Sequence, residues 1–205
     1  GMQSERESLK RLTSVSSKVS AHYLIGRSGR IFNLVDVKYV AWHAGKSMWK
    51  KNKNLNKNSI GIELVNKGHK FGYQKFTKIQ IKNLISLCKK LKKKYKIKNN
   101  FILAHSDIAP IRKIDPGEKF PWQYLSINGI GNYPKKIDIK NKYKKTQNNG
   151  LFFKNLYKIG YRYLNSKYKT KIIKNFQRKY RQKKINGIID FETLKLSQIL
   201  SKSSN

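Results

Sequence analysis

The spacing of apolar residues predicts two helices in the first half of the chain. Residues 76–95 repeat apolar side chains near the helical period, and Thr77 with Gln80 forms a capping-box pattern at the start of that segment. Residues 4–12 also fit a short helix. Both segments carry polar residues on the opposite side, as expected of helices that cover one face of a core.

Short apolar runs bounded by polar residues or glycine predict strands between and after these helices. The turn-forming sequence 26–29 indicates that the first two runs make a hairpin, whereas residues 42–58 show no period and are expected to be a loop. The predicted strands are 20–25, 30–35, 59–65 and 101–104. Strands that alternate with helices predict an α/β fold in which helices flank a central sheet.

The chain changes character at residue 134. Residues 134–150 are rich in Lys, Asn and Gln, which indicates a linker after a first domain at 1–133. Beyond it, three short apolar-periodic segments predict a small three-helix domain at 151–205, with Asp190 as an N-cap. These predicted helices are 151–159, 171–180 and 191–200.

Composition narrows the picture only slightly. The 205 residues are 38% hydrophobic, enough for a core, and no apolar run approaches the length of a membrane span. The single Cys88 cannot form an internal disulfide and is interpreted as a small buried hydrophobe. The net charge of +37 is spread along the chain rather than clustered, so we expect no nucleic-acid partner. A basic surface would still favour encounter with an anionic polymer.

The candidate chemistry is concentrated in the proline-punctuated segment 105–122. It holds His105 and Asp115, whose side chains are both zinc donors, with Lys113 two residues before the carboxylate. Glu63 ends a strand that is expected to be buried, where carboxylates seldom lie without a partner or a task. Asp115 followed by Pro and Gly could instead be an ordinary turn, and Glu63 could pair with a lysine.

Four motifs in order resemble the type-2 N-acetylmuramoyl-L-alanine amidases, over roughly residues 1–133. They are Val-Ser-Ala-His-Tyr-Leu-Ile at 19–25, Ala-Trp-His-Ala-Gly at 41–45, Ser-Ile-Gly-Ile-Glu at 59–63 and the segment 105–122. The resemblance implies a mixed sheet flanked by helices and a Zn²⁺-dependent enzyme. It would cut the amide bond between N-acetylmuramic acid and L-alanine in peptidoglycan or its fragments.

The same resemblance implies roles for individual residues. His105 and Asp115 match two zinc ligands, Glu63 matches the general base, and Lys113 matches the lysine that stabilises the oxyanion. The family's first zinc ligand is a histidine on a strand that would lie upstream of Gly1. We therefore expect that the chain lacks its native N-terminus and holds two of the three ligands.

Trp42 and His43 are expected to line the substrate groove, although a purely structural role for His43 stays open. His22 lies in an alternating strand and is interpreted as a hydrogen-bonded core histidine. In the C-terminal part, the patterns around Gly160, 176–180 and 186–190 resemble a peptidoglycan-binding helical domain. A three-helix module with another partner is the alternative.

The leading hypothesis is thus a monomeric zinc amidase of the periplasm or cell envelope that binds peptidoglycan or muropeptides. A cytoplasmic recycling enzyme is the alternative location. The competing functions are a protein that binds peptidoglycan without cutting it and, on charge alone, a nucleic-acid binder, which would show tight and strongly salt-dependent DNA binding.

Overall fold

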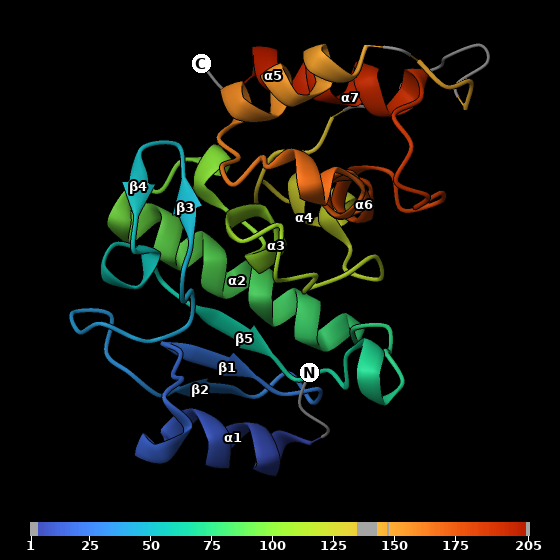
Figure 1. The fold of residues 1–205 in the computed structure, drawn as a ribbon. Helices are drawn as coiled ribbons and strands as arrows, with labels where there is room; N and C mark the ends of the chain where they lie inside the picture. The colour runs from blue at the N-terminus through green and yellow to red at the C-terminus, as the bar shows by residue number, and fades with distance from the viewer. Residues whose placement is uncertain (1–3, 135–142, 147, 204–205) are drawn as a thin grey trace. The chain divides into compact units, whose positions relative to one another are not determined.

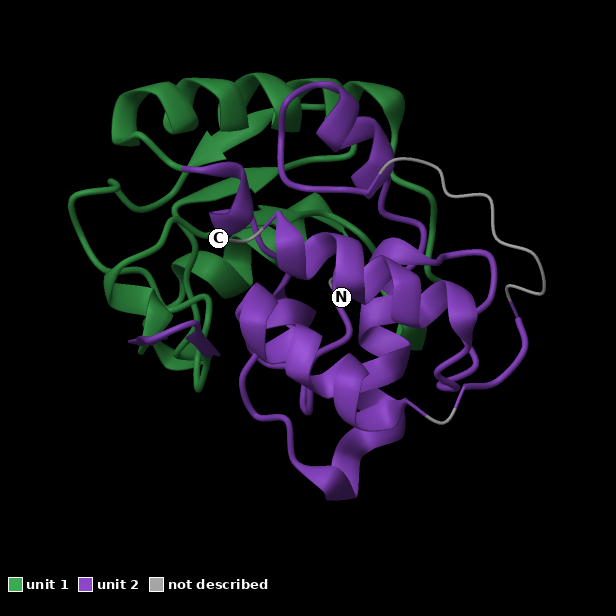
Figure 2. Cartoon of the chain, turned by 90° about the horizontal axis from the view of Figure 1, so that it is seen from above, with its two compact units in different colours: residues 1–47, 53–97 green, residues 48–52, 98–205 purple. Residues whose placement is uncertain are grey.

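A computed structural model describes residues 4–134, 143–146 and 148–203 (Figure 1). The chain forms two compact units, shown in different colours in Figure 2. Unit 1 contains residues 1–47 and 53–97, and unit 2 contains residues 48–52 and 98–205.

Unit 1 is built on a three-stranded mixed sheet in the order β2-β1-β5. The central strand β1 (Tyr23–Ile25) pairs antiparallel with β2 (Ile31–Asn33) and parallel with β5 (Ile62–Leu64). In the turn between β1 and β2, Gly29 adopts a φ of +88° that L side chains rarely take. The predicted hairpin and the mixed sheet are therefore confirmed.

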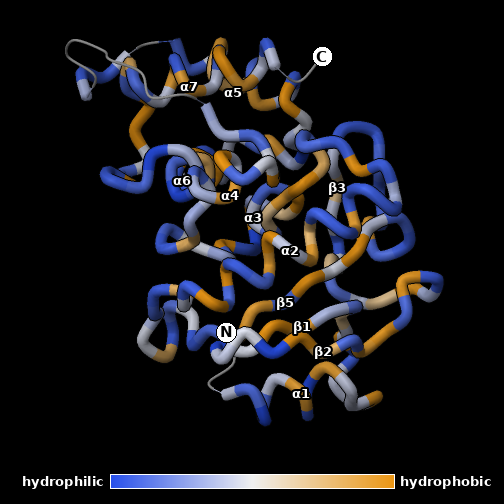
Figure 3. The backbone as a smooth tube through the Cα atoms, turned by 180° about the vertical axis from the view of Figure 1, so that it is seen from behind, coloured by the Kyte–Doolittle hydropathy of each residue, from blue (hydrophilic) through white to orange (hydrophobic). Residues whose placement is uncertain are grey.

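Two helices pack with this sheet. Helix α1 (Glu5–Thr13) contributes Leu12 to a buried cluster with Leu24 of β1 and Val65. The tube through β1 and β5 is coloured as largely apolar in Figure 3, in keeping with their place in the core. The long helix α2 (Lys78–Tyr95) carries a row of apolar side chains that are buried. They are Ile81, Leu84, Ile85, Leu87 and Leu91.

The start of α2 confirms one half of the predicted capping box and corrects the other. The Thr77 hydroxyl accepts a hydrogen bond from the Gln80 backbone N–H at 3.2 Å. The Gln80 side chain does not complete the box; it is fully buried and donates to the carbonyl oxygens of Ile25 (3.0 Å) and Val65 (3.1 Å). These carbonyls lie at and just past the ends of β1 and β5, where strand backbone needs partners.

Residues 42–58 are more ordered than the loop predicted from the sequence. They include the strand β3 (Met48–Trp49), which belongs to unit 2, its two-residue partner β4 (Asn52–Lys53), and the 3₁₀ turn η2 (Leu55–Lys57) of unit 1. Further 3₁₀ turns of unit 1 are η1 (Val15–Ser17) and η3 (His69–Phe71).

Unit 2 is mainly helical over its described residues. Its helices are α3 (His105–Ile108), α4 (Trp122–Ile127), α5 (Asn149–Ile159), α6 (Lys169–Tyr180) and α7 (Phe191–Lys202), with the 3₁₀ turn η5 (Ser166–Tyr168) before α6. Asp190 caps α7 as predicted, because its carboxylate accepts from the Thr193 N–H at 3.0 Å. Phe152 and Phe176 meet edge to face in the core, with ring centroids 5.2 Å apart. The three predicted C-terminal helices are confirmed.

The strand predicted at 101–104 is wrong. The chain forms the 3₁₀ turn η4 (Asn99–Phe101) and then an unpaired stretch that leads into α3. Phe101 is 43% exposed, so this apolar run is not a buried strand. A short apolar run is compatible with several structures, and a strand also needs a neighbouring strand with free backbone groups.

Most of the predicted linker at 134–150 lies outside the described residues, and the predicted domain boundaries stay predictions. Cys88 is half-buried on α2, and burial, partly opposed by Lys92, raises the pKa of its thiol to about 11. Within the described ranges, no helix is both long enough and apolar enough to cross a membrane.

Candidate active site

The segment that follows residue 104 is shaped by its own hydrogen bonds. Helix α3 begins at His105, and the Asp107 carboxylate accepts from the Ala104 N–H at 2.7 Å, which closes the first turn. The Ser106 N–H donates to the Asp115 carbonyl at 3.1 Å. This bond brings the two ends of the loop 105–115 together, so that residues ten positions apart become neighbours.

The two predicted metal ligands meet at this point. His105 Nδ1 lies 3.1 Å from Asp115 Oδ2, with the His105 side chain 15% exposed and the Asp115 side chain 55% exposed. Ligand atoms about 2.0–2.2 Å from a tetrahedral zinc ion lie about 3.3–3.6 Å from each other, a few tenths of an ångström more than this pair. An imidazole nitrogen and a carboxylate oxygen at this separation, on a partly open surface, fit two corners of a zinc site.

The charges around Asp115 favour its ionised form. Burial opposes the charge, but the hydrogen bond and charge of His105 and the charge of Lys113 lower the pKa of Asp115 to about 2. On the other side of the ring, His105 Nε2 lies 3.4 Å from Nη2 of Arg112. The loop thus gathers a carboxylate, an imidazole and two cationic side chains.

A catalytic zinc ion usually takes three protein ligands. Within the described residues no group of three or more His, Cys, Asp or Glu side chains is placed to hold a metal ion. The structure therefore brings His105 and Asp115 together, and their role as metal ligands stays a prediction.

Glu63 lies in unit 1, half-buried in the middle of β5. Its register partner across the parallel pairing is Leu24 of β1. Side chains at paired positions share a face of the sheet, so Glu63 emerges on the same face as the apolar Leu24. Glu63 is half-buried on that face, and its role as a general base stays a prediction.

Trp42 and His43 also lie in unit 1, on the segment before β3. The Trp42 side chain is 54% exposed. The backbone N–H groups of His43 and Ala44 both donate to Asn56 Oδ1, at 3.1 and 2.7 Å. Asn56 therefore fixes the backbone on which His43 stands.

Gly61 provides the space that the His43 ring occupies. A Cβ at Gly61 would lie 2.3 Å from His43 Cγ, so the imidazole lies directly on the glycine backbone. The neighbouring His22 is 1% exposed; its Nδ1 accepts from the Gly61 N–H at 3.0 Å, and its Nε2 lies 3.1 Å from the Tyr39 carbonyl oxygen. The interpretation of His22 as a hydrogen-bonded core histidine is confirmed.

Sequence reasoning missed a set of buried polar residues around the loop. Asp107, Tyr161, Asn175 and Lys179 are each no more than 4% exposed. Asp107 accepts hydrogen bonds from Tyr161 (2.6 Å) and Lys179 (2.5 Å). Asp107 is one of only 10 acidic residues in the chain, and that scarcity was the one available signal.

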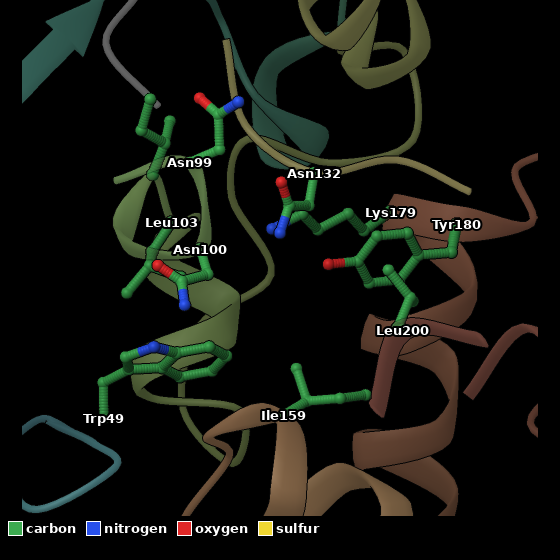
Figure 4. A pocket seen from close by; sticks show the side chains of 10 residues that line it. Trp49, Asn99, Asn100, Leu103, Asn132, Ile159, Lys179, Tyr180 and Leu200 are labelled. Carbon is green, nitrogen blue, oxygen red and sulfur yellow. The ribbon is translucent and has the colours of Figure 1, made fainter. Parts of the chain in front are cut away.

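A small cavity in unit 2 is too small to hold a sugar or peptide. Its volume is about 20 Å³, room for roughly one water molecule. Trp49, Asn100, Lys179 and Tyr180 are among the side chains that line it (Figure 4). This cavity is therefore not the substrate site.

Comparison with known proteins identifies the family of the chain. Residues 1–118 match the family Amidase_2, described as N-acetylmuramoyl-L-alanine amidase. The chain belongs to this family. The Escherichia coli N-acetylmuramoyl-L-alanine amidase AmiD is 42% identical over 134 residues, which are 60% of this chain and 49% of AmiD. The 1,6-anhydro-N-acetylmuramyl-L-alanine amidase AmpD of Haemophilus influenzae is 44% identical over 111 residues, 53% of this chain and 58% of AmpD.

The chain thus spans about half the length of these curated relatives. Among solved structures, E. coli AmiD in complex with anhydro-N-acetylmuramic acid-L-Ala-D-γ-Glu-L-Lys is 34% identical, with a TM-score of 0.85. That match covers 98% of this chain and 85% of the AmiD chain. The predicted amidase family and fold class are confirmed.

Proposed function

We propose that this protein is a zinc-dependent amidase that hydrolyses the bond between N-acetylmuramic acid and L-alanine in peptidoglycan or its fragments. The observation that carries the proposal is the 3.1 Å approach of His105 Nδ1 and Asp115 Oδ2. These residues occupy the positions at which the sequence resembles the amidase ligands. A carboxylate–imidazole pair of this kind suits zinc.

The chemistry follows from the residues present. His105 and Asp115 would hold a zinc ion, which lowers the pKa of a water molecule and polarises the scissile carbonyl. The Glu63 carboxylate accepts the proton of the attacking water and passes it to the leaving amine. The Lys113 ammonium stabilises the negative charge that develops on the carbonyl oxygen. Trp42, exposed beside His43, offers an aromatic face to the sugar or the peptide.

The substrate class in the proposal rests on the relatives. E. coli AmiD has been solved with the anhydromuramic peptide named above as its substrate. We extend that class to this chain and assign peptidoglycan binding to the C-terminal helices α5, α6 and α7, which lie where the sequence resembles a peptidoglycan-binding helical domain. A monomer that acts in the periplasm or cell envelope completes the proposal.

The decisive experiment measures zinc content and release of free peptide from an anhydromuropeptide side by side. It uses this chain and, where the gene encodes residues before Gly1, a version that includes them. Glu63→Gln should reduce kcat by about 10²–10⁴-fold, because the proton acceptor is lost while the side chain keeps its shape. Zinc content should not change, since Glu63 holds no metal in this proposal.

Glu7→Gln is the matched control, because Glu7 is an exposed acid on α1. This variant should turn over substrate at the wild-type rate. Undiminished turnover in Glu63→Gln would remove Glu63 from the mechanism. If both chain versions retain peptidoglycan but neither binds zinc nor cleaves it, the protein is a binding protein rather than an enzyme.

A further inference from the structure

One side of helix α6 makes buried contacts with the loop that carries the candidate metal ligands. Asn175 is 2% exposed, and its Nδ2 donates to the carbonyl oxygens of Pro110 and Lys113, both at 2.8 Å. Its Oδ1 accepts from Arg178 at 3.0 Å. A single amide side chain therefore joins the carbonyls of Pro110 and Lys113, which lie at the two ends of the turn that leads to Asp115.

A second contact holds the beginning of the loop. Lys179, one turn after Asn175 on α6, pairs with Asp107 at 2.5 Å, and the Tyr161 hydroxyl donates to the other Asp107 oxygen at 2.6 Å. The Lys179 ammonium also lies 4.3 Å from the centroid of the Trp122 ring. Burial lowers and Asp107 raises the pKa of Lys179, with a net rise, so the lysine stays charged.

The end of the loop is held in the same way. Arg178 Nε lies 3.6 Å from the Glu118 carboxylate, and Gln182 Nε2 donates to the Phe120 carbonyl at 2.7 Å. The segment from 107 to 120 thus has contacts with α6, or with the residues just after it, at its start, middle and end. Loop backbone has no strand partner and depends on such outside bonds for a single conformation.

We propose that α6 is part of the catalytic unit, and that Asn175 is a positioning residue that sets the geometry of Lys113 and Asp115. This proposal rests on the proposed amidase function, because it assigns the geometry of that site. Residues behind a metal site orient its ligands, and their loss typically weakens metal affinity or activity about 10- to 100-fold. It adds a second role to a helix whose sequence suggests only wall binding.

The chain offers a matched control on the same helix. Gln177 is also a fully buried amide, but it bonds to a different partner, the turn before α7. Its Nε2 donates to the Ile188 carbonyl at 2.9 Å, and its Oε1 accepts from the Gly187 N–H at 2.8 Å. Asn175→Ala and Gln177→Ala each remove a buried amide from α6, but only the first releases the loop.

The test compares these two variants with the wild type. All three proteins are made in the chain version that cleaves muropeptides in the experiment described under the proposed function. Both variants should lower Tm. Only Asn175→Ala should speed amide hydrogen exchange in 105–115, where the Ser106 N–H and Lys113 N–H are bonded within the loop. Only Asn175→Ala should weaken zinc binding by about 10- to 100-fold and lower kcat, with KM within about twofold of the wild-type value.

Equal exchange rates, zinc affinity and kcat in the two variants would overturn the positioning role, since Asn175 would then act through stability alone. Failure of the proposed function has a different signature, because the wild type itself would neither bind zinc nor cleave substrate. Hydrogen exchange separates the two cases, since it reports on the loop without metal or turnover. Lys179 is less suited to the test, because loss of one partner of a buried ion pair is strongly destabilising.

Discussion

The sheet of unit 1 and the loop 105–120 of unit 2 are held by different kinds of interaction. In the sheet, Leu24 and Ile25 are fully buried, and the Gln80 side chain bonds to the carbonyls at the strand ends. In the loop, the Asp107 carboxylate and backbone carbonyls accept hydrogen bonds from an ammonium and an amide of α6, about sixty to seventy positions later in the chain. The scaffold is held by burial of apolar surface and the candidate site by directed polar contacts.

This difference has a physical reason. Apolar burial is non-directional and tolerates small shifts, which suits a sheet that only has to stay folded. A loop that holds metal ligands needs side chains fixed within a fraction of an ångström, and hydrogen bonds with defined geometry provide that restraint. The cost is sensitivity, because a buried polar group that loses its partner is destabilising.

The largest expected loss of stability comes from a substitution that breaks a contact of the loop. Lys179→Met should lower the free energy of unfolding by about 3–5 kcal/mol, because it leaves the buried Asp107 carboxylate without its cation. Urea unfolding monitored by tryptophan fluorescence measures this change. Lys171→Met, at an exposed position of the same helix, is the control and should stay within about 0.5 kcal/mol of the wild type. A loss in Lys179→Met no greater than in the control would show that the pair does not stabilise the loop.

The next largest loss of stability is expected from a substitution in the core of the sheet. Leu24→Ala should cost about 2–5 kcal/mol, because the side chain is fully buried between α1 and the neighbouring strands and its removal leaves a cavity. Ile31→Ala on β2, where the side chain is 41% exposed, should cost clearly less. The same unfolding experiment measures both. Equal losses at the two positions would contradict a core centred on β1.

The smallest expected loss of stability comes from a substitution at Gly61. Gly61→Ala should cost about 1–3 kcal/mol, because the new methyl group would overlap the His43 ring. Thermal unfolding measures the loss, and the His43 imidazole resonances should shift in the NMR spectrum. Gly150→Ala is the opposite control: nothing lies within 4 Å of the added Cβ, and alanine favours helix α5 by about 0.5–1 kcal/mol. Unchanged His43 resonances in Gly61→Ala would contradict the close packing of the ring.

The sequence predicted well where local rules suffice. The apolar period of α2, the Thr77 cap, the glycine turn between β1 and β2 and the Asp190 cap of α7 all depend on residues a few positions apart. The motifs at 41–45, 59–63 and 105–122 likewise identified the amidase family, because each is a contiguous run of residues. His105 and Asp115 could be paired because they share one short segment.

The predictions that were wrong or incomplete also share a cause. The strand predicted at 101–104 needed a partner strand, and the apolar run itself carries no information about one. Gln80 completes a capping-box pattern in the sequence, yet its side chain bonds to strand carbonyls far along the chain. Asn175 and Lys179 look like ordinary polar residues of a lysine-rich helix until their partners are known.

Local sequence patterns were thus enough to predict the amidase family, the mixed sheet with its helices and the residues proposed for the chemistry. Those features follow from apolar periodicity and from motifs that are contiguous in the chain. The contacts of α6 with the loop 105–120 came to light in the folded chain alone, as did the common burial of Asp107, Tyr161, Asn175 and Lys179. Polar contacts depend on distance and direction in space, and residues more than fifty positions apart acquire both only when the chain folds.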